Sequence, residues 1–108
     1  MSDFEMSGAL RGFTNLVFLE FHVEQTTGDC TLTLALGPRD ATSNLRLRVE
    51  FFGVSCMTLK NLGGGLTQLL LLTVNDIRDR QLDRLNYEVS ELEKATLFCL
   101  CREIAISH

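Results

Sequence analysis

One stretch of this chain of 108 residues places an imidazole between two carboxylates. Glu20, His22 and Glu24 are spaced two residues apart. In an extended strand such side chains project from one face, where together they could hold a metal ion. No further ligand lies close enough in the sequence to complete a metal site. We therefore expect a solvated strand face without a metal or other cofactor, and we regard these three residues as a candidate contact patch.

The four cysteines lack the spacing of a zinc site. Cys99 and Cys101 are two residues apart, Cys30 and Cys56 stand alone, and C-x-x-C occurs nowhere in the chain. A structural zinc site needs paired cysteines with about two to four residues between them. In the reducing cytoplasm a free cysteine behaves as a small buried apolar residue. We expect free thiols and no structural zinc.

The sequence also shows no acid–base constellation typical of an enzyme, although counting residues does not exclude paired carboxylates. His22 is the only interior histidine, since His108 ends the chain, and no G-x-S-x-G motif is present. A nucleophile would have no obvious base and orienting acid beside it. The run from Gly63 to Gly65 lacks the lysine and the helix pattern of a phosphate-binding loop. We expect a protein that is not an enzyme.

Charge limits the class of partner. Acidic residues outnumber basic ones by 14 to 10, which gives a net charge of −4. A general nucleic-acid binder needs clustered positive charge, so we expect no nucleic-acid partner. The middle of the chain is mildly basic and both flanking parts are acidic. The favoured interpretation is cross-strand pairing on a shared outer face, of Glu20 or Glu24 with Arg46 or Arg48, and the alternative is a dedicated basic site.

The densest polar cluster lies between residues 75 and 94, where acidic residues alternate with arginines. An acidic surface of this kind speeds association with a basic partner and fixes its register. The same residues also fit a solvated helix or loop with local ion pairs, such as Asp76 with Arg80. The acidic members of this candidate partner-binding group are Asp76, Asp79, Asp83, Glu88, Glu91 and Glu93.

Alternating hydrophobicity predicts strands along most of the chain. Residues 17–24 alternate with Val17, Leu19, Phe21 and Val23 on one side, which is typical of a half-buried strand. Residues 26–29 supply a turn, and residues 30–36 alternate again, so the two segments should form a hairpin.

The rest of the chain continues this pattern. Further strands are predicted over residues 45–52, 54–59, 87–90 and 96–106, with Gly53 marking a bend. The leucine-rich segment 68–74 is apolar on both sides, which indicates a central strand covered on both faces. Residues 75–86 fit a short helix capped by Asn75 or Asp76 and fit an ordered loop equally well.

These elements predict the fold class. Six to seven short strands, with at most one or two short helices, favour a mainly β protein: an antiparallel β-sandwich or an open half-barrel. Residues 1–108 should form a single β-rich domain. No segment has the length of apolar sequence that crosses a bilayer, and the start of the chain has no secretory signal, so we expect a cytoplasmic protein with no membrane partner.

About half of the chain, residues 45–102, carries a recognisable order of strand and turn signals. These signals are Phe51-Phe52-Gly53-Val54, Gly63-Gly64-Gly65, Asp76-Ile77-Arg78-Asp79-Arg80-Gln81, Tyr87-Glu88-Val89 and Phe98-Cys99. In this order the stretch resembles small bacterial all-β proteins, some of which are immunity proteins for secreted toxins. It departs from them at Leu82, where an aromatic residue is common. The resemblance implies a cytoplasmic protein that binds and blocks a toxin domain.

The leading functional hypothesis is therefore a non-enzymatic immunity protein that neutralises a bacterial toxin domain by stoichiometric occlusion. Its partner would be a basic protein domain, because toxic nucleases hold nucleic acid on basic surfaces. Two alternatives remain open at this stage. A half-barrel with an apolar interior could carry a small apolar ligand. A structural subunit could pair through an exposed edge strand.

Overall fold

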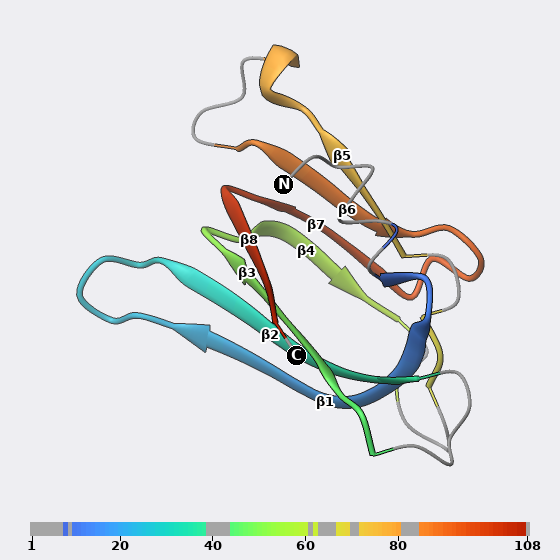
Figure 1. The fold of residues 1–108 in the computed structure, drawn as a ribbon. Helices are drawn as coiled ribbons and strands as arrows, with labels where there is room; N and C mark the ends of the chain where they lie inside the picture. The colour runs from blue at the N-terminus through green and yellow to red at the C-terminus, as the bar shows by residue number, and fades with distance from the viewer. Residues whose placement is uncertain are drawn as a thin grey trace.

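Two four-stranded antiparallel sheets make up the fold of the computed structural model (Figure 1). The structure describes residues 8, 10–38, 44–60, 62, 67–69, 72–80 and 85–107. The mainly β prediction is confirmed, but with eight strands instead of six to seven. The additional strand arises because the predicted last strand, residues 96–106, is divided in two at Arg102.

The first sheet contains both ends of the strand sequence. Its order is β1-β2-β3-β8, with bounds β1 Phe13–Val23, β2 Cys30–Pro38, β3 Leu47–Phe52 and β8 Glu103–Ser107. The predicted hairpin is confirmed, since Val23 of β1 pairs with Cys30 of β2 across the turn.

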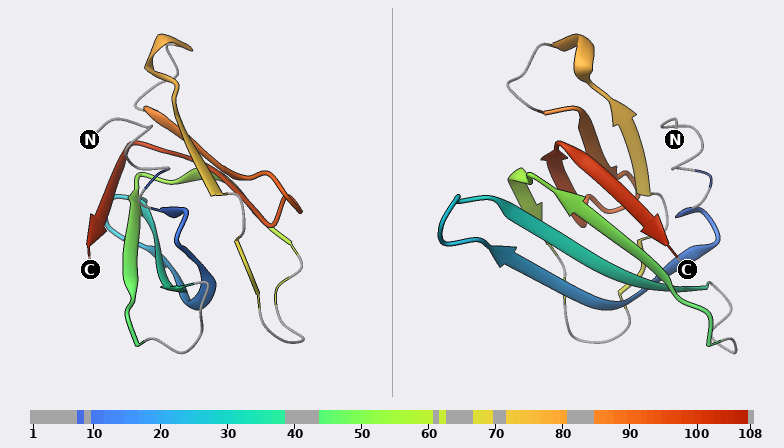
Figure 2. Two further views of the ribbon diagram at one scale, coloured as in Figure 1. Left: turned by 45° about the vertical axis from the view of Figure 1, so that its right-hand side comes forward. Right: turned by 60° about the vertical axis from the view of Figure 1, so that its left-hand side comes forward.

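The second sheet is built from the middle of the chain. Its order is β4-β7-β6-β5, with bounds β4 Ser55–Leu59, β7 Leu97–Cys101, β6 Tyr87–Glu91 and β5 Leu72–Asp76. Where the sequence predicts a short helix after β5, the described residues form a 3-10 turn, η1 (Arg78–Arg80). Figure 2 shows the two sheets as separate layers.

The core lies between the two sheets. Leu32, Leu34 and Leu36 of β2 alternate with half-exposed or polar residues, and all three are fully buried. Val49 is aligned with Leu34 on the neighbouring strand, so one apolar row crosses the sheet. The second sheet contributes Val89, Leu97, Cys99 and Cys101 to the same cluster. Burial of alternate side chains from two facing sheets is the arrangement that stabilises sandwiches of this kind.

The chain passes between the sheets at two bends that touch each other. Gly53 separates β3 from β4, and Arg102 separates β7 from β8. The Arg102 amide donates to the Phe52 carbonyl at 2.8 Å, and the Val54 amide donates to the Cys30 carbonyl at 3.0 Å. Gly53 has φ +65°, a conformation that favours glycine because it has no Cβ. We call Gly53, Val54 and Arg102 the crossing corner.

The leucine-rich segment differs from its prediction. The pattern over residues 68–74 predicts a central strand, but β5 begins at Leu72 and lies at an edge of the second sheet, paired with β6. Leu72 and Val74 are buried while Thr73 and Asn75 alternate with them, so only one face is covered. Leu69 is buried beside β1, where its amide donates to the Thr14 carbonyl. Leu70 and Leu71 lie outside the described residues.

The thiols are free, as predicted. Cys99 and Cys101 are buried on one face of β7, and the side-chain hydrogen bond with Cys99, followed by burial, raises the pKa of Cys101. The expectation that the cysteines are buried is wrong for Cys56, which is exposed at a positive φ of 54°. Among the described residues, no helix is long and apolar enough to cross a membrane.

Replacing Gly53 with alanine is expected to destabilise the protein by about 2–5 kcal/mol. The left-handed backbone alone costs about 1–2 kcal/mol for a residue with a Cβ. The new Cβ would also lie 3.0 Å from Arg102 Cβ, and relieving such crowding costs about 1–3 kcal/mol more. Gly28→Ala is the matched control, because Gly28 has φ +76° but a Cβ added there would meet no atom within 4 Å. Urea unfolding measures both; equal losses would contradict the importance of the Arg102 approach.

Candidate partner-binding surfaces

The predicted acidic group is divided by the fold. Asp76 ends β5, Asp79 lies in η1, and Glu88 lies near the start of β6, so these three residues are at one end of the β5–β6 hairpin. Glu91 and Glu93 lie at the opposite end, because β6 runs away from η1. Asp83 lies outside the described residues.

Asp76 holds the η1 end together. Its Oδ1 accepts a hydrogen bond from the Arg78 amide at 2.9 Å, which caps the 3-10 turn as the sequence predicted. The Arg78 guanidinium also donates to both carboxylate oxygens and lies over the Tyr87 ring, 5.8 Å from its centroid. The side-chain and backbone hydrogen bonds from Arg78 lower the pKa of Asp76 from 3.8 to about 2. The carboxylate is therefore an anion throughout the neutral range.

The second ion pair of this end joins η1 to β6. Arg80 Nη1 lies 2.7 Å from Glu88 Oε2. The predicted pairing of Asp76 with Arg80 is wrong, because a 3-10 turn after a strand does not bring residues four apart together as an α-helix does. Two of the three acidic residues at the η1 end are thus matched by arginines, which reduces its net negative charge.

Glu91 is buried and stabilises the turn that follows β6. The residue is 2% exposed, and its two carboxylate oxygens accept from the Glu93 amide at 3.1 Å and the Lys94 amide at 2.7 Å. The carboxylate thereby holds the β6–β7 turn closed. Glu93 is exposed on that turn. The acidic residues that the structure presents together are therefore Asp76, Asp79 and Glu88.

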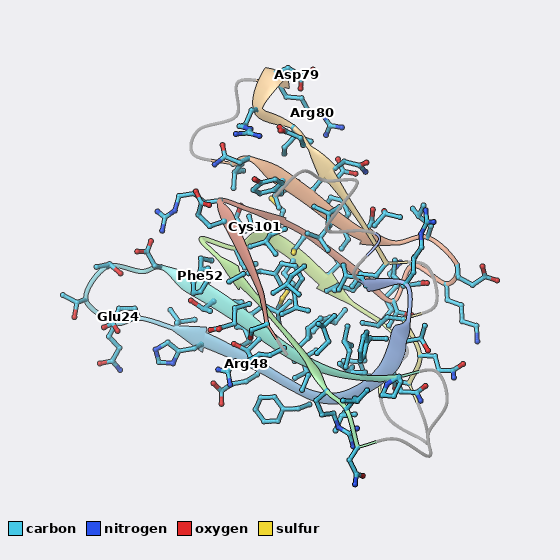
Figure 3. The ribbon with its side chains drawn as sticks, in the orientation of Figure 1. Glu24, Arg48, Phe52, Asp79, Arg80 and Cys101 are labelled. Carbon is cyan, nitrogen blue, oxygen red and sulfur yellow. The ribbon has the colours of Figure 1, made fainter. Side chains whose placement is uncertain are left out.

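The second patch lies on the outer face of β1 and on the residue that follows the strand. Glu20, His22 and Glu24 are all exposed, and Glu24 lies at the tip of the β1–β2 hairpin, far from Asp79 in Figure 3. Among the described residues no group of three or more potential ligands is arranged to hold a metal ion.

The predicted pairing of these glutamates with arginines is wrong. Strand β2 lies between β1 and β3, so Glu20 is beside Thr33, and Thr33 is beside Glu50. Arg48 instead forms an ion pair with Glu50 of its own strand, at 3.4 Å. Residue spacing does not determine strand order, and here β2 separates the glutamates from the arginines.

Apolar side chains surround the same segment of β1. Val17, Phe18, Phe21 and Val23 are between 40% and 53% exposed. The alternating pattern predicted a buried side for this strand, but only Leu19 of it is half-buried. The hairpin projects beyond the second sheet (Figures 1 and 2), so none of the described strands lies opposite the distal part of its inner face. The sequence signal for this exposed region is the presence of phenylalanines, Phe18 and Phe21, on opposite faces of one strand.

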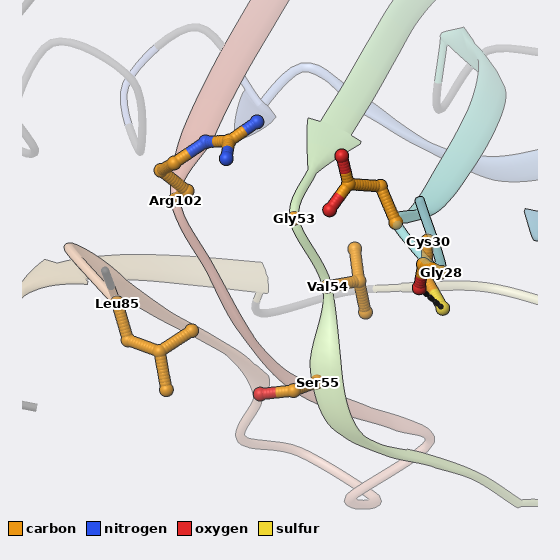
Figure 4. A pocket seen from close by; sticks show the side chains of 8 residues that line it. Gly28, Cys30, Gly53, Val54, Ser55, Leu85 and Arg102 are labelled. Carbon is orange, nitrogen blue, oxygen red and sulfur yellow. Dashed lines mark hydrogen bonds between the residues drawn. The ribbon is translucent and has the colours of Figure 1, made fainter. Parts of the chain in front are cut away.

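The chain also has a small pocket at the crossing corner. It has a volume of about 210 Å³ and is lined by Cys30, Val54, Leu85 and Arg102, among others (Figure 4). Pockets for small organic ligands are usually about 300–1,000 Å³. The pocket therefore gives no support to the carrier alternative.

We expect Arg78→Gln to return the pKa of Asp76 toward 3.8, because the neutral amide removes the charge-assisted hydrogen bonds. In the wild-type protein the folded-state pKa is depressed, so the stabilisation is present above about pH 4 and lost as the pH falls toward 2. A carbon-13 NMR titration of the Asp76 carboxyl measures this directly. An unchanged midpoint in the variant would contradict the assignment.

Glu91→Ala is expected to destabilise the fold by about 1–3 kcal/mol, because it leaves two amides of the turn without their acceptors. Glu93→Ala is the control, and as an exposed substitution it should change stability by less than about 0.5 kcal/mol. Chemical unfolding separates the two. If both variants were equally stable, Glu91 would not hold the turn.

Comparison with known protein families gives a match over most of the chain. The family described as immunity protein PIM8 matches residues 11–107, which is almost the whole chain. No curated protein and no solved structure matches significantly. The chain belongs to the PIM8 family of immunity proteins.

Proposed function

We propose that this protein neutralises a toxin domain by binding it one-to-one and covering the surface that the toxin needs. The observation that carries the proposal is the family match over residues 11–107, which includes every strand of both sheets. Neutralisation of this kind needs a complementary surface and no catalytic residue. The toxin would be met in the cytoplasm of a bacterial cell.

We propose β1 as the main contact region. It combines exposed aromatic and aliphatic side chains with the carboxylates of Glu20 and Glu24. Apolar anchors within a charged surround are typical of residues that dominate binding energy, whereas the charges set specificity and association rate. A toxin surface that is basic around an apolar centre would be complementary to this region.

The η1 end is a second region of contact in this proposal. Asp79 is exposed there, beside the Asp76–Arg78 and Arg80–Glu88 pairs. Because those pairs are already formed within the protein, this end offers less uncompensated charge than β1. We therefore expect its contribution to binding to be the smaller of the two.

Affinity capture tests the function. The tagged chain would be exposed at moderate salt to the toxin domain encoded beside its own gene, with the toxin active site disabled. The proposal predicts a stable one-to-one complex that blocks the activity of the intact toxin. Failure to bind any neighbouring toxin domain would overturn it.

The double variant Glu20→Lys, Glu24→Lys is expected to weaken toxin binding by at least about tenfold, because it places two positive charges against a basic surface, where like charges cost several kcal/mol. Asp79→Lys, alone or with Asp83→Lys, should weaken binding less. Circular dichroism confirms that each variant folds. Isothermal titration at two salt concentrations gives the affinities; a larger loss from the η1 variants would reverse the assignment of the main region.

A further inference from the structure

The free edge of β1 is covered along only part of its length. The Leu16 amide donates to the Thr67 carbonyl at 2.9 Å, and the Leu69 amide donates to the Thr14 carbonyl at 2.7 Å. Residues 67–69 therefore cover the first part of the β1 edge. Their cover ends where β1 has a bulge, between Leu16 and Phe18. Beyond the bulge, no other strand of the described residues pairs with the outer edge of β1.

The register of the hairpin shows which backbone groups point out of that edge. The Glu24 amide donates to the Asp29 carbonyl at 2.8 Å, so this is a hydrogen-bonded pair of the ladder. Hydrogen-bonded and non-hydrogen-bonded pairs alternate along an antiparallel ladder. His22 and Glu20 therefore bond to β2, whereas the amides and carbonyls that point away from β2 belong to Leu19, Phe21 and Val23.

Side chains on both faces flank these outward backbone groups. Phe18, Glu20 and His22 lie on the outer face of the sheet, and Phe21 and Val23 lie on the opposite face. All five are exposed. A strand added to this edge would therefore be held by the backbone and by side chains on both of its faces.

We propose that the toxin binds by adding an extended segment to the edge of β1 between Leu19 and Val23. This inference rests on the proposed function and specifies its mode of recognition. The segment would alternate apolar and basic residues. Its apolar side chains would pack beside Phe21 and Val23, and its lysines or arginines would lie beside Glu20 and Glu24.

A second copy of this chain fits the edge less well. Pairing of two β1 strands would bring Glu20 and Glu24 of both chains, four carboxylates in all, onto one short ladder. Like charges that face one another across strands are destabilising. Charged residues on an edge strand are also a common means of preventing self-association. The same charges attract a basic segment.

Amide hydrogen exchange, followed by NMR, tests this mode with the wild-type protein and the inactivated toxin domain. In the free protein the amides of Phe21 and Val23 should exchange quickly, while that of His22 is protected by β2. In the complex all three should be protected. A complex that forms while Phe21 and Val23 still exchange quickly would overturn strand addition and leave the proposed function intact. Absence of a complex would overturn both.

Two variants at one position separate backbone from side-chain recognition. Val23→Pro removes an amide that points away from β2, so the hairpin ladder keeps its own hydrogen bonds. Val23→Ala keeps the amide and removes most of the side chain. Strand addition predicts that Val23→Pro binds the toxin domain about tenfold or more weakly than Val23→Ala, because proline removes the donor and obstructs the added strand. Equal affinities would overturn the proposal.

Light scattering of the free protein tests whether a second copy of the chain occupies the edge of β1. The proposal predicts a monomer. A dimer that both Val23→Pro and the Glu20→Lys, Glu24→Lys variant alter would assign the edge to a second copy of the chain, and would overturn the toxin as its occupant.

Discussion

The contact between Gly53 and Arg102 is the constraint on which the rest of the fold depends. At this point the chain leaves the first sheet after β3, and later returns to it after β7. The hydrogen bond from the Arg102 amide to the Phe52 carbonyl joins the β3–β4 connection to the β7–β8 connection. Because β8 then pairs with β3, β8 forms one edge of the first sheet and β1 forms the opposite edge.

This arrangement connects the core to the proposed binding surface. The corner positions two sheets so that the leucines of β2 face Val89 and Leu97 across the core. The second sheet does not extend as far as the tip of the β1–β2 hairpin (Figure 1). Among the described strands, the distal part of β1 is therefore paired with β2 alone, and its phenylalanines stay exposed. The exposed face follows from where the sheets cross, and the phenylalanines on both faces of β1 are the local sequence signal for it.

Much of the fold follows from local patterns. The β1–β2 hairpin, the alternation of β2 and β3, the bend at Gly53 and the cap at Asp76 were all predictable, because each depends on residues close in sequence. Strand order was not, since it depends on contacts between distant segments. Residue spacing therefore wrongly predicts pairing between the glutamates of β1 and arginines that β2 separates from them. It also wrongly predicts that β5 is a central strand, whereas β5 lies at an edge.

The candidate site was likewise predictable only in part. Residue types identified the acidic groups but not their exposure. Glu91 is buried against its own turn, while Glu93, two residues further along, is exposed. The exposed apolar residues of β1 were missed, because alternation predicts one buried side and cannot indicate where the covering sheet ends.

The central claim is that this immunity protein acts by stoichiometric occlusion of a toxin domain. Titration of the toxin's activity with increasing amounts of the purified chain tests it most directly. With the toxin well above the dissociation constant, the activity should fall linearly and reach its minimum at one molecule of this protein per toxin. Inhibition that continues at much lower ratios would indicate catalytic inactivation, and undiminished activity at excess protein would contradict the account altogether.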